Sequence, residues 1–115
     1  MEKSNDEFFG IIVYSIEPDG CLNGLWTNIA NYGIIRNEIA QKENIINEIN
    51  KNEIEGEYIV TYIEDDKKVY YGKLVIEKRQ EKGKDFYYLK WVFNDKAEFE
   101  GKGFIIGKQL VVSYH

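Results

Sequence analysis

The stretch IIVYSIEPDGCLNGLW (11–26) contains two apolar segments separated by Pro18–Gly20. Proline favours the first corner of a type I turn, and glycine fits the left-handed position of the G1 bulge that follows. Apolar and polar residues alternate on both sides, which is typical of strands with one buried face. The stretch therefore predicts a β-hairpin in which Tyr14 lies opposite Gly24.

The same pattern occurs three times without gaps, and the other copies are IVTYIEDDKKVYYGKL (59–74) and YLKWVFNDKAEFEGKG (88–103). An aromatic residue precedes each glycine by ten positions, and an aliphatic residue precedes it by twelve. A shared register predicts Tyr62 opposite Gly72 and Trp91 opposite Gly101, with the rings on the inner face. Glycine weakens a strand interior, so we interpret these glycines as shape-determining residues that a large ring covers. A ligand approaching the glycine backbone is the alternative.

Alternation and turn signals across the chain indicate a β protein. Gly107 and Lys108 fit a two-residue turn, and QEKGKD (80–85) fits a longer polar loop. For 33–56 the pattern is mixed; we favour a strand over 34–42, and a loop or weak strand near 45–50. The predicted strands are Phe8–Glu17, Cys21–Asn28, Ile34–Lys42, Glu57–Glu64, Val69–Arg79, Phe86–Phe93, Glu98–Ile106 and Lys108–Tyr114.

Eight antiparallel strands joined by hairpins predict an all-β, up-and-down barrel, because closure removes exposed sheet edges. A two-layer β-sandwich is the alternative. The chain of 115 residues is long enough for one modest core, and we place a single domain at 8–115 after a flexible segment at 1–7.

Charge and hydropathy restrict the partners. The net charge of −5 argues against nucleic acid, since phosphate binding needs a cationic surface. No apolar run approaches the ~18 residues of a membrane span, so we expect no membrane partner. Cys21 is the only cysteine and MEKSNDE (1–7) has no apolar h-region, which together favour a cytoplasmic location. A secreted form processed from a precursor is the alternative.

The residue types needed for most enzyme chemistry are scarce. His115 is the only histidine, and at the last position of the sequence we expect it to be disordered. No histidine-based metal cluster, no Ser-His or Cys-His pair within the fold, and no glycine-rich phosphate loop can be identified. We therefore expect no cofactor, no bound metal and no enzymatic activity.

Asp19–Trp26, DGCLNGLW, resembles a hairpin of the avidin-like members of the calycin superfamily, in which an Asp-Gly turn is followed by Leu-x-Gly-x-aromatic. The resemblance covers under a fifth of the chain. In avidins a Gly-x-Trp-x-Asn strand precedes this hairpin and supplies a biotin contact, whereas NDEFFG (5–10) stands here. The resemblance implies a barrel with a pocket at one end, and it does not imply biotin.

The predicted inner face carries Tyr14, Trp26, Tyr62 and Trp91. An eight-stranded barrel has room inside for side chains or for one small ligand. We therefore predict a non-enzymatic binding protein that holds a small apolar or aromatic ligand at the barrel mouth, with these four residues as the candidate lining. The alternative is a protein-binding module, such as an inhibitor or immunity-type partner, with a filled core.

Two further features leave alternatives open. Arg36 and Glu38 share one face of the predicted strand; they either point into the barrel, where a buried ion pair needs further hydrogen bonds, or lie on a solvated edge.

Apolar residues also occupy outward positions on the later strands, and if these strands lie side by side a homo-oligomer would bury them. The residues of this predicted patch are Tyr71, Phe86, Tyr88 and Val111, with Val92 nearby.

Overall fold

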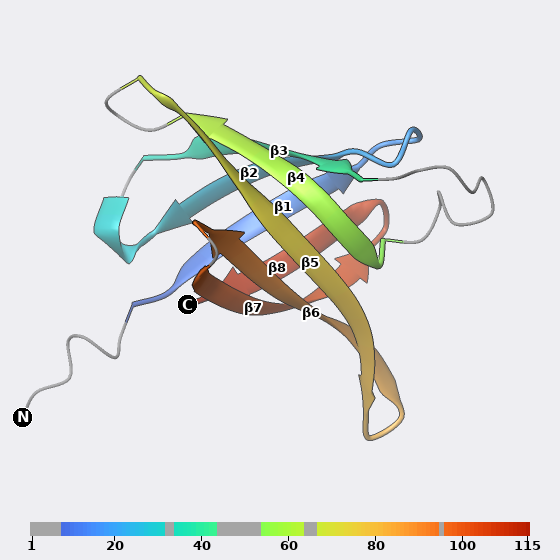
Figure 1. Cartoon of the computed structure of the whole chain (residues 1–115). Coiled ribbons are helices and arrows are strands. Elements are labelled where there is room, and N and C mark those ends of the chain that lie inside the picture. The colour runs from blue at the N-terminus through green and yellow to red at the C-terminus, as the bar shows by residue number, and fades with distance from the viewer. Residues whose placement is uncertain (1–7, 32–33, 44–53, 64–66, 95) are drawn as a thin grey trace, which may run out of the picture.

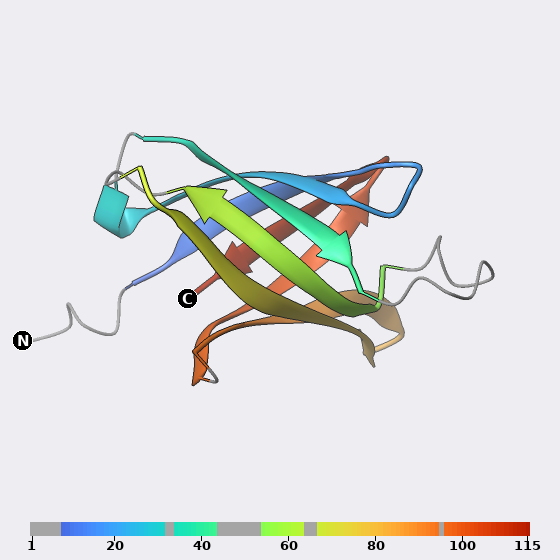
Figure 2. The same cartoon turned by 45° about the horizontal axis from the view of Figure 1, so that its top comes forward.

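The computed structural model describes residues 8–31, 34–43, 54–63, 67–94 and 96–115 (Figure 1). Each strand pairs with its neighbours in the sequence, and β8 pairs with β1, so the sheet closes into a barrel (Figures 1 and 2). The eight-stranded antiparallel up-and-down barrel is thus confirmed, and the sandwich alternative is wrong. The strands are β1 (Gly10–Ile16), β2 (Leu22–Asn28), β3 (Arg36–Lys42), β4 (Gly56–Ile63), β5 (Val69–Glu81), β6 (Lys84–Phe93), β7 (Lys96–Ile106) and β8 (Gln109–Tyr114).

The first hairpin has the predicted register, with Tyr14 paired to Gly24. Gly20 has a φ of +93°, its N–H donates to the Glu17 carbonyl (3.0 Å), and the Glu17 N–H donates to the Cys21 carbonyl (2.9 Å). These are the contacts that a three-residue turn with a left-handed glycine requires. A Cβ on Gly24 would lie 2.9 Å from the Tyr14 ring, so the ring does cover bare backbone.

The register predicted for the other two hairpins is wrong. Val60, not Tyr62, pairs with Gly72, and Leu89, not Trp91, pairs with Gly101. Neither hairpin has a Pro-Asp-Gly turn to set the first hairpin's spacing, so the aliphatic residue twelve positions earlier faces the glycine. Because the partner of each glycine differs from the predicted one by two residues, the neighbouring side chains still lie on their predicted faces of the sheet.

The glycines nevertheless shape the sheet, through different neighbours. A Cβ on Gly72 would lie 2.0 Å from Cε1 of Phe93, on a strand adjacent to its own, rather than against Tyr62. A Cβ on Gly101 would lie 2.8 Å from the Ser113 carbonyl oxygen, because β8 approaches β7 closely there. The space at both positions is occupied by the protein itself, which supports the structural interpretation.

The structure confirms two of the local expectations and contradicts a third. The strand predicted at 34–42 is confirmed as β3, while the loop or weak strand predicted near 45–50 and the N-terminal segment 1–7 lie outside the described residues. The two-residue connection at Gly107 and Lys108 is confirmed. The expected disorder of His115 is wrong: its N–H donates to the Glu100 carbonyl (2.8 Å), and its carbonyl accepts from the Glu100 N–H (3.0 Å).

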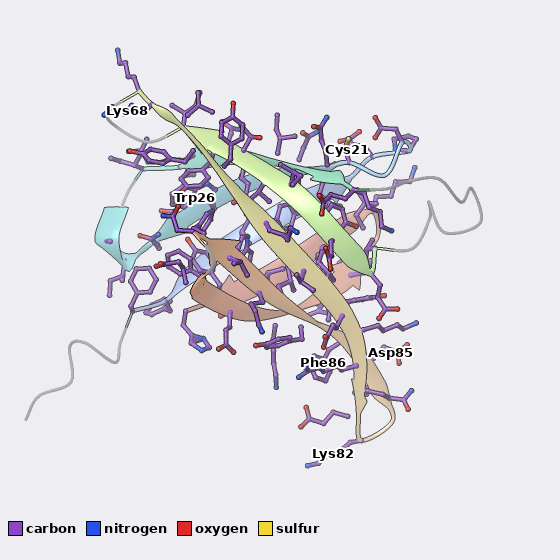
Figure 3. All side chains as sticks on the ribbon, in the orientation of Figure 1. Cys21, Trp26, Lys68, Lys82, Asp85 and Phe86 are labelled. Atoms are coloured by element: carbon purple, nitrogen blue, oxygen red, sulfur yellow. The ribbon has the colours of Figure 1, made fainter. Side chains whose placement is uncertain are left out.

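The polar loop expected at 80–85 is also wrong. β5 and β6 continue to the pair Glu81 and Lys84, joined by Lys82 and Gly83, and this hairpin extends beyond the barrel (Figure 1). Lys82, together with Asp85 and Phe86, lies on the extended part (Figure 3). Lys82 and Gly83 both have positive φ (52° and 80°), as a type I′ turn requires, and such turns match the twist of paired strands.

The two ends of the barrel are filled differently. Aliphatic side chains fill the end that holds the turn at Pro18–Gly20, and there the buried Tyr58 hydroxyl donates to the Ile54 carbonyl (2.7 Å). Aromatic side chains surround the other end, where β1 begins, β8 ends and the 3-10 turn η2 (Ile29–Asn31) lies (Figure 1). Within the described residues, no helix has the length and apolar character needed to span a membrane.

The predicted outward patch on the later strands does not form one surface. Tyr71 lies near the start of β5, whereas Phe86 pairs with Arg79 near the other end of that strand. Arg79 lies over the Tyr88 ring (4.2 Å to the centroid) and Lys102 over the Phe86 ring (4.9 Å), so a cation contacts each of these rings. Val111 pairs with residues of β1 and β7, and Tyr71 lies on β5 opposite β4.

Candidate functional site

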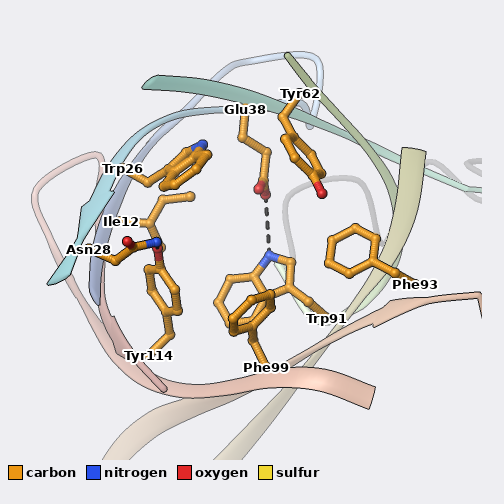
Figure 4. A pocket seen from close by; sticks show the side chains of 9 residues that line it. All are labelled: Ile12, Trp26, Asn28, Glu38, Tyr62, Trp91, Phe93, Phe99 and Tyr114. Atoms are coloured by element: carbon orange, nitrogen blue, oxygen red, sulfur yellow. Dashed lines mark hydrogen bonds between the residues drawn. The ribbon is translucent and has the colours of Figure 1, made fainter. Parts of the chain in front are cut away.

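A cavity of about 120 Å³ opens at the aromatic end of the barrel (Figure 4). Its lining comes from β1, β2, β3, β4, β6, β7 and β8, so nearly the whole ring of strands contributes. Strand alternation turns these side chains inward. The lining residues are Ile12, Trp26, Asn28, Glu38, Tyr62, Trp91, Phe93, Phe99 and Tyr114.

Six rings form a collar around the cavity. Each contacts the next, with neighbouring centroids 5.5–6.4 Å apart and mostly tilted or edge-on. These are the separations at which aromatic pairs attract one another. Along this series of contacts the rings are those of Trp26, Tyr62, Phe93, Phe99, Tyr114 and Trp91, and Ile12 and Asn28 lie between Trp26 and Tyr114 (Figure 4).

Glu38 places a carboxyl group inside the collar. It alternates with outward residues along β3 and is only 6 % exposed, the one buried charged residue in the described part of the chain. The Tyr14 hydroxyl and the Trp91 Nε1–H (3.3 Å) both donate to Oε2 of Glu38 (Figure 4 shows the bond from Trp91). Glu38 therefore points into the barrel, and the solvated-edge alternative is wrong.

The environment of Glu38 changes its proton affinity. Burial raises the pKa of Glu38 to about 7, against the smaller opposing effect of the hydrogen bonds from Tyr14 and Trp91. Burial and the adjacent Glu38 raise the pKa of Tyr14 well above its ordinary value, so the hydroxyl keeps its proton. Near neutral pH the carboxyl can thus hold a proton or present a negative charge.

The other polar groups of the cavity are few. The Asn28 amide donates to the Tyr114 hydroxyl (3.0 Å). The indole N–H of Trp26 is buried and has no hydrogen-bond partner among the described residues. Unsatisfied buried donors are rare in proteins and call for an explanation, such as an acceptor brought by a bound molecule.

The candidate lining of Tyr14, Trp26, Tyr62 and Trp91 can now be placed. Trp26, Tyr62 and Trp91 lie in the collar, whereas Tyr14 is fully buried beneath it and holds the Glu38 carboxyl. The lining residues absent from that set are Ile12, Asn28, Phe93, Phe99 and Tyr114, and Glu38 was left between two alternatives. Phe93 follows Trp91 by two positions and therefore shares its face of β6, so the sequence does not tell which of the inward residues lie at the open end.

The lining offers aromatic rings, one carboxyl group and the Asn28 amide as its chemical groups. A carboxyl that titrates near neutrality can exchange a proton with a bound molecule, but acid–base or nucleophilic catalysis also needs a second reactive group in place. In the lining that the structure describes there is no Ser, Cys, His or Lys. Rings and one carboxyl can enclose and orient a small molecule.

No protein-family model matches the chain, and no match was found among curated proteins or among solved structures. The avidin-like resemblance therefore rests on the sequence of the first hairpin. The finding that stands is an eight-stranded antiparallel barrel with a cavity at one end.

Proposed function

We propose that this chain is a non-enzymatic binding protein that holds one small apolar or aromatic molecule in the cavity at the open end of the barrel. The observation that carries the proposal is the collar of six rings around a cavity of about 120 Å³. A cavity of roughly 150 Å³ accommodates a benzene-sized molecule. An end-opening pocket is also what the avidin-like hairpin implies.

The two tryptophans provide a direct test, because the chain has only two and both line the cavity. We expect titration with benzyl alcohol to shift the indole N–H signals of Trp26 and Trp91 in ¹H–¹⁵N spectra. Tyr62→Leu should weaken binding by removing one collar ring. The matched control is Tyr71→Leu, since Tyr71 is 68 % exposed and outside the cavity. Unshifted indole signals up to the solubility limit of the probe would refute the proposal.

A second candidate function is association with another protein, and the outer face of β8, β1, β2 and β3 favours it. The chain is 30% charged, yet none of the outward positions on these strands carries a charge. Interface centres show the same depletion of charged residues. The outward residues are Gln109, Val111, Ser113, Ile11, Val13, Ser15, Asn23, Leu25, Thr27, Asn37, Ile39 and Gln41.

We assign this neutral face to a second copy of the chain. Two copies, each of net charge −5, repel wherever their charged surfaces meet, and contact through a neutral face reduces that repulsion. An apolar row crosses the face, because Val13 pairs with Leu25 on one side and Val111 on the other, and Val111 pairs with Phe104. Leu25 is 54 % exposed and Phe104 is 52 % exposed, so the row is open to a partner.

Light scattering after size exclusion should then show a dimer that Leu25→Lys converts to a monomer. Tyr71→Lys, also on the outer surface but on β5, should leave the dimer intact. A wild-type chain that stays monomeric at the highest soluble concentration would rule this candidate out.

A further inference from the structure

We infer that the ligand of the cavity is a small organic cation whose substituted ammonium nitrogen lies against Glu38 and whose hydrocarbon groups contact the ring collar. This inference rests on the proposed function and names the ligand class for the same site. A neutral apolar ligand would use the rings and leave the buried carboxyl without a role. A cation uses both.

In the part of the chain that the structure describes, no positive charge neutralises Glu38. Among the described residues, no lysine or arginine forms an ion pair with Glu38, and both of its hydrogen bonds end on Oε2. A buried carboxylate is costly unless it is paired with a positive charge and hydrogen-bonded. The two donors supply hydrogen bonds, and a cation in the cavity would supply the pairing.

The rings supply the second attraction. A cation is drawn to the face of an aromatic ring within about 6 Å of its centroid, and tryptophan gives the strongest effect. Here Trp26 and Trp91 take part in a collar whose members surround one small volume, so a bound ammonium group has rings on several sides (Figure 4). Aromatic cages of this kind are how proteins recognise methylated ammonium groups.

The size of the cavity and the indole N–H of Trp26 restrict the chemical class of the ligand further. At about 120 Å³ the cavity accepts a molecule of only a few heavy atoms. The buried N–H of Trp26 has no acceptor among the described residues, so an oxygen on the ligand would satisfy it. A short amino alcohol, with an ammonium group for Glu38 and an oxygen for Trp26, meets both requirements.

Binding of a cation should depend on the ionisation of Glu38. The other titratable or charged groups that contact Glu38, share its strand face or line the cavity are the hydroxyls of Tyr14, Tyr62 and Tyr114, the guanidinium of Arg36 and the ammonium group of Lys42. Phenol, guanidinium and ammonium groups ordinarily do not change charge between about pH 5 and about pH 8. Glu38 is therefore the group in this set whose charge changes in that range, and a cation should displace its proton.

The decisive comparison uses choline and its neutral isostere 3,3-dimethylbutan-1-ol, which has carbon in place of the ammonium nitrogen. At about pH 8 we expect choline to bind about tenfold or more tightly than the isostere, by the shifts of the Trp26 and Trp91 indole signals. The preference should fall to the smaller part that the rings alone supply at about pH 5.5 and in Glu38→Gln. The matched control Glu98→Gln, at an exposed site, should behave like the wild type.

Calorimetry adds a readout that a purely structural role of Glu38 would not move. Choline binding to the wild type at about pH 6.5 should release protons, seen as a dependence of the binding enthalpy on the buffer. This measurement decides the question even where Glu38→Gln fails to fold. If the isostere binds as tightly as choline, or if no protons are released, the cation inference is wrong while the proposed function stands. If choline, the isostere and benzyl alcohol all fail to bind, both are wrong.

Discussion

Replacing Glu38 by glutamine should make the protein more stable at neutral and alkaline pH. The pKa of Glu38 in the folded chain is about 7, against 4.5 for an ordinary glutamate. Between these values the folded chain holds a proton that the unfolded chain has released. Stability therefore falls as pH rises from about 4.5 to about 7, and the loss is complete above the folded pKa.

The size of the effect follows from the same two values. Since each tenfold change in proton affinity corresponds to about 1.4 kcal/mol, ionised Glu38 destabilises the fold by about 3 kcal/mol above pH 7. Glutamine has no charge to bury, and its amide oxygen can accept the bonds that Tyr14 and Trp91 now donate. The variant should match the wild type near pH 4.5 and gain up to about 3 kcal/mol near pH 8.

Urea unfolding followed by tryptophan fluorescence, repeated across this pH range, measures the difference. The control Glu98→Gln removes one acidic side chain at an exposed site, and its stability curve should run parallel to that of the wild type. A constant difference between Glu38→Gln and the wild type at every pH would show that Glu38 titrates normally. A loss of stability near pH 8 would show that the charge itself supports the fold, and the reasoning would fail.

Three further predictions concern the same structure. Tyr14→Phe removes a hydrogen-bond donor to the Glu38 carboxylate, so the pKa of Glu38, measured from its carboxyl ¹³C shift, should rise above about 7. The free energy of unfolding should fall by about 1–2 kcal/mol. Gly72→Val should cost about 1–3 kcal/mol in urea unfolding, and Phe93→Leu should recover part of this loss where trimming another collar ring should not. Lys82→Asn should raise the free energy of unfolding by about 0.5–1 kcal/mol in urea unfolding, because asparagine tolerates positive φ better than lysine.

The fold could be predicted from the sequence because its signals are local. Alternation predicts the strands other than β3, whose pattern is mixed, and turn residues such as Pro18–Gly20 and Gly107–Lys108 predict some of the connections. The pairing register could be predicted only where a turn had a defined geometry, so Tyr14 opposite Gly24 was correct and Tyr62 opposite Gly72 was not. Sequence spacing alone does not tell how many residues a turn will use.

The candidate site depends on distances around a closed barrel, which no local pattern contains. Phe93 and Phe99 are close together in the sequence. Trp26, by contrast, contacts Tyr62 only because β2 and β4 are both adjacent to β3. The sequence could not predict the role of Glu38 either, since a strand with a mixed polar and apolar pattern does not show whether its glutamate points inward or lies on a solvated edge. Closure of the barrel distinguishes them.

The buried position of Glu38 indicates that its negative charge has a functional role. Glutamine would accept both hydrogen bonds, keep the shape of the side chain and avoid a penalty of about 3 kcal/mol above pH 7, a large share of the roughly 5–15 kcal/mol that holds a small domain folded. Local conflicts of this kind are expected where a fold gives up stability for function. The conflict lies inside the ring collar, while aliphatic side chains fill the opposite end. Trp26 lines the same cavity, and its indole N–H has no acceptor among the described residues. A ligand that brings a cation to the carboxylate and an acceptor to the indole would satisfy both groups.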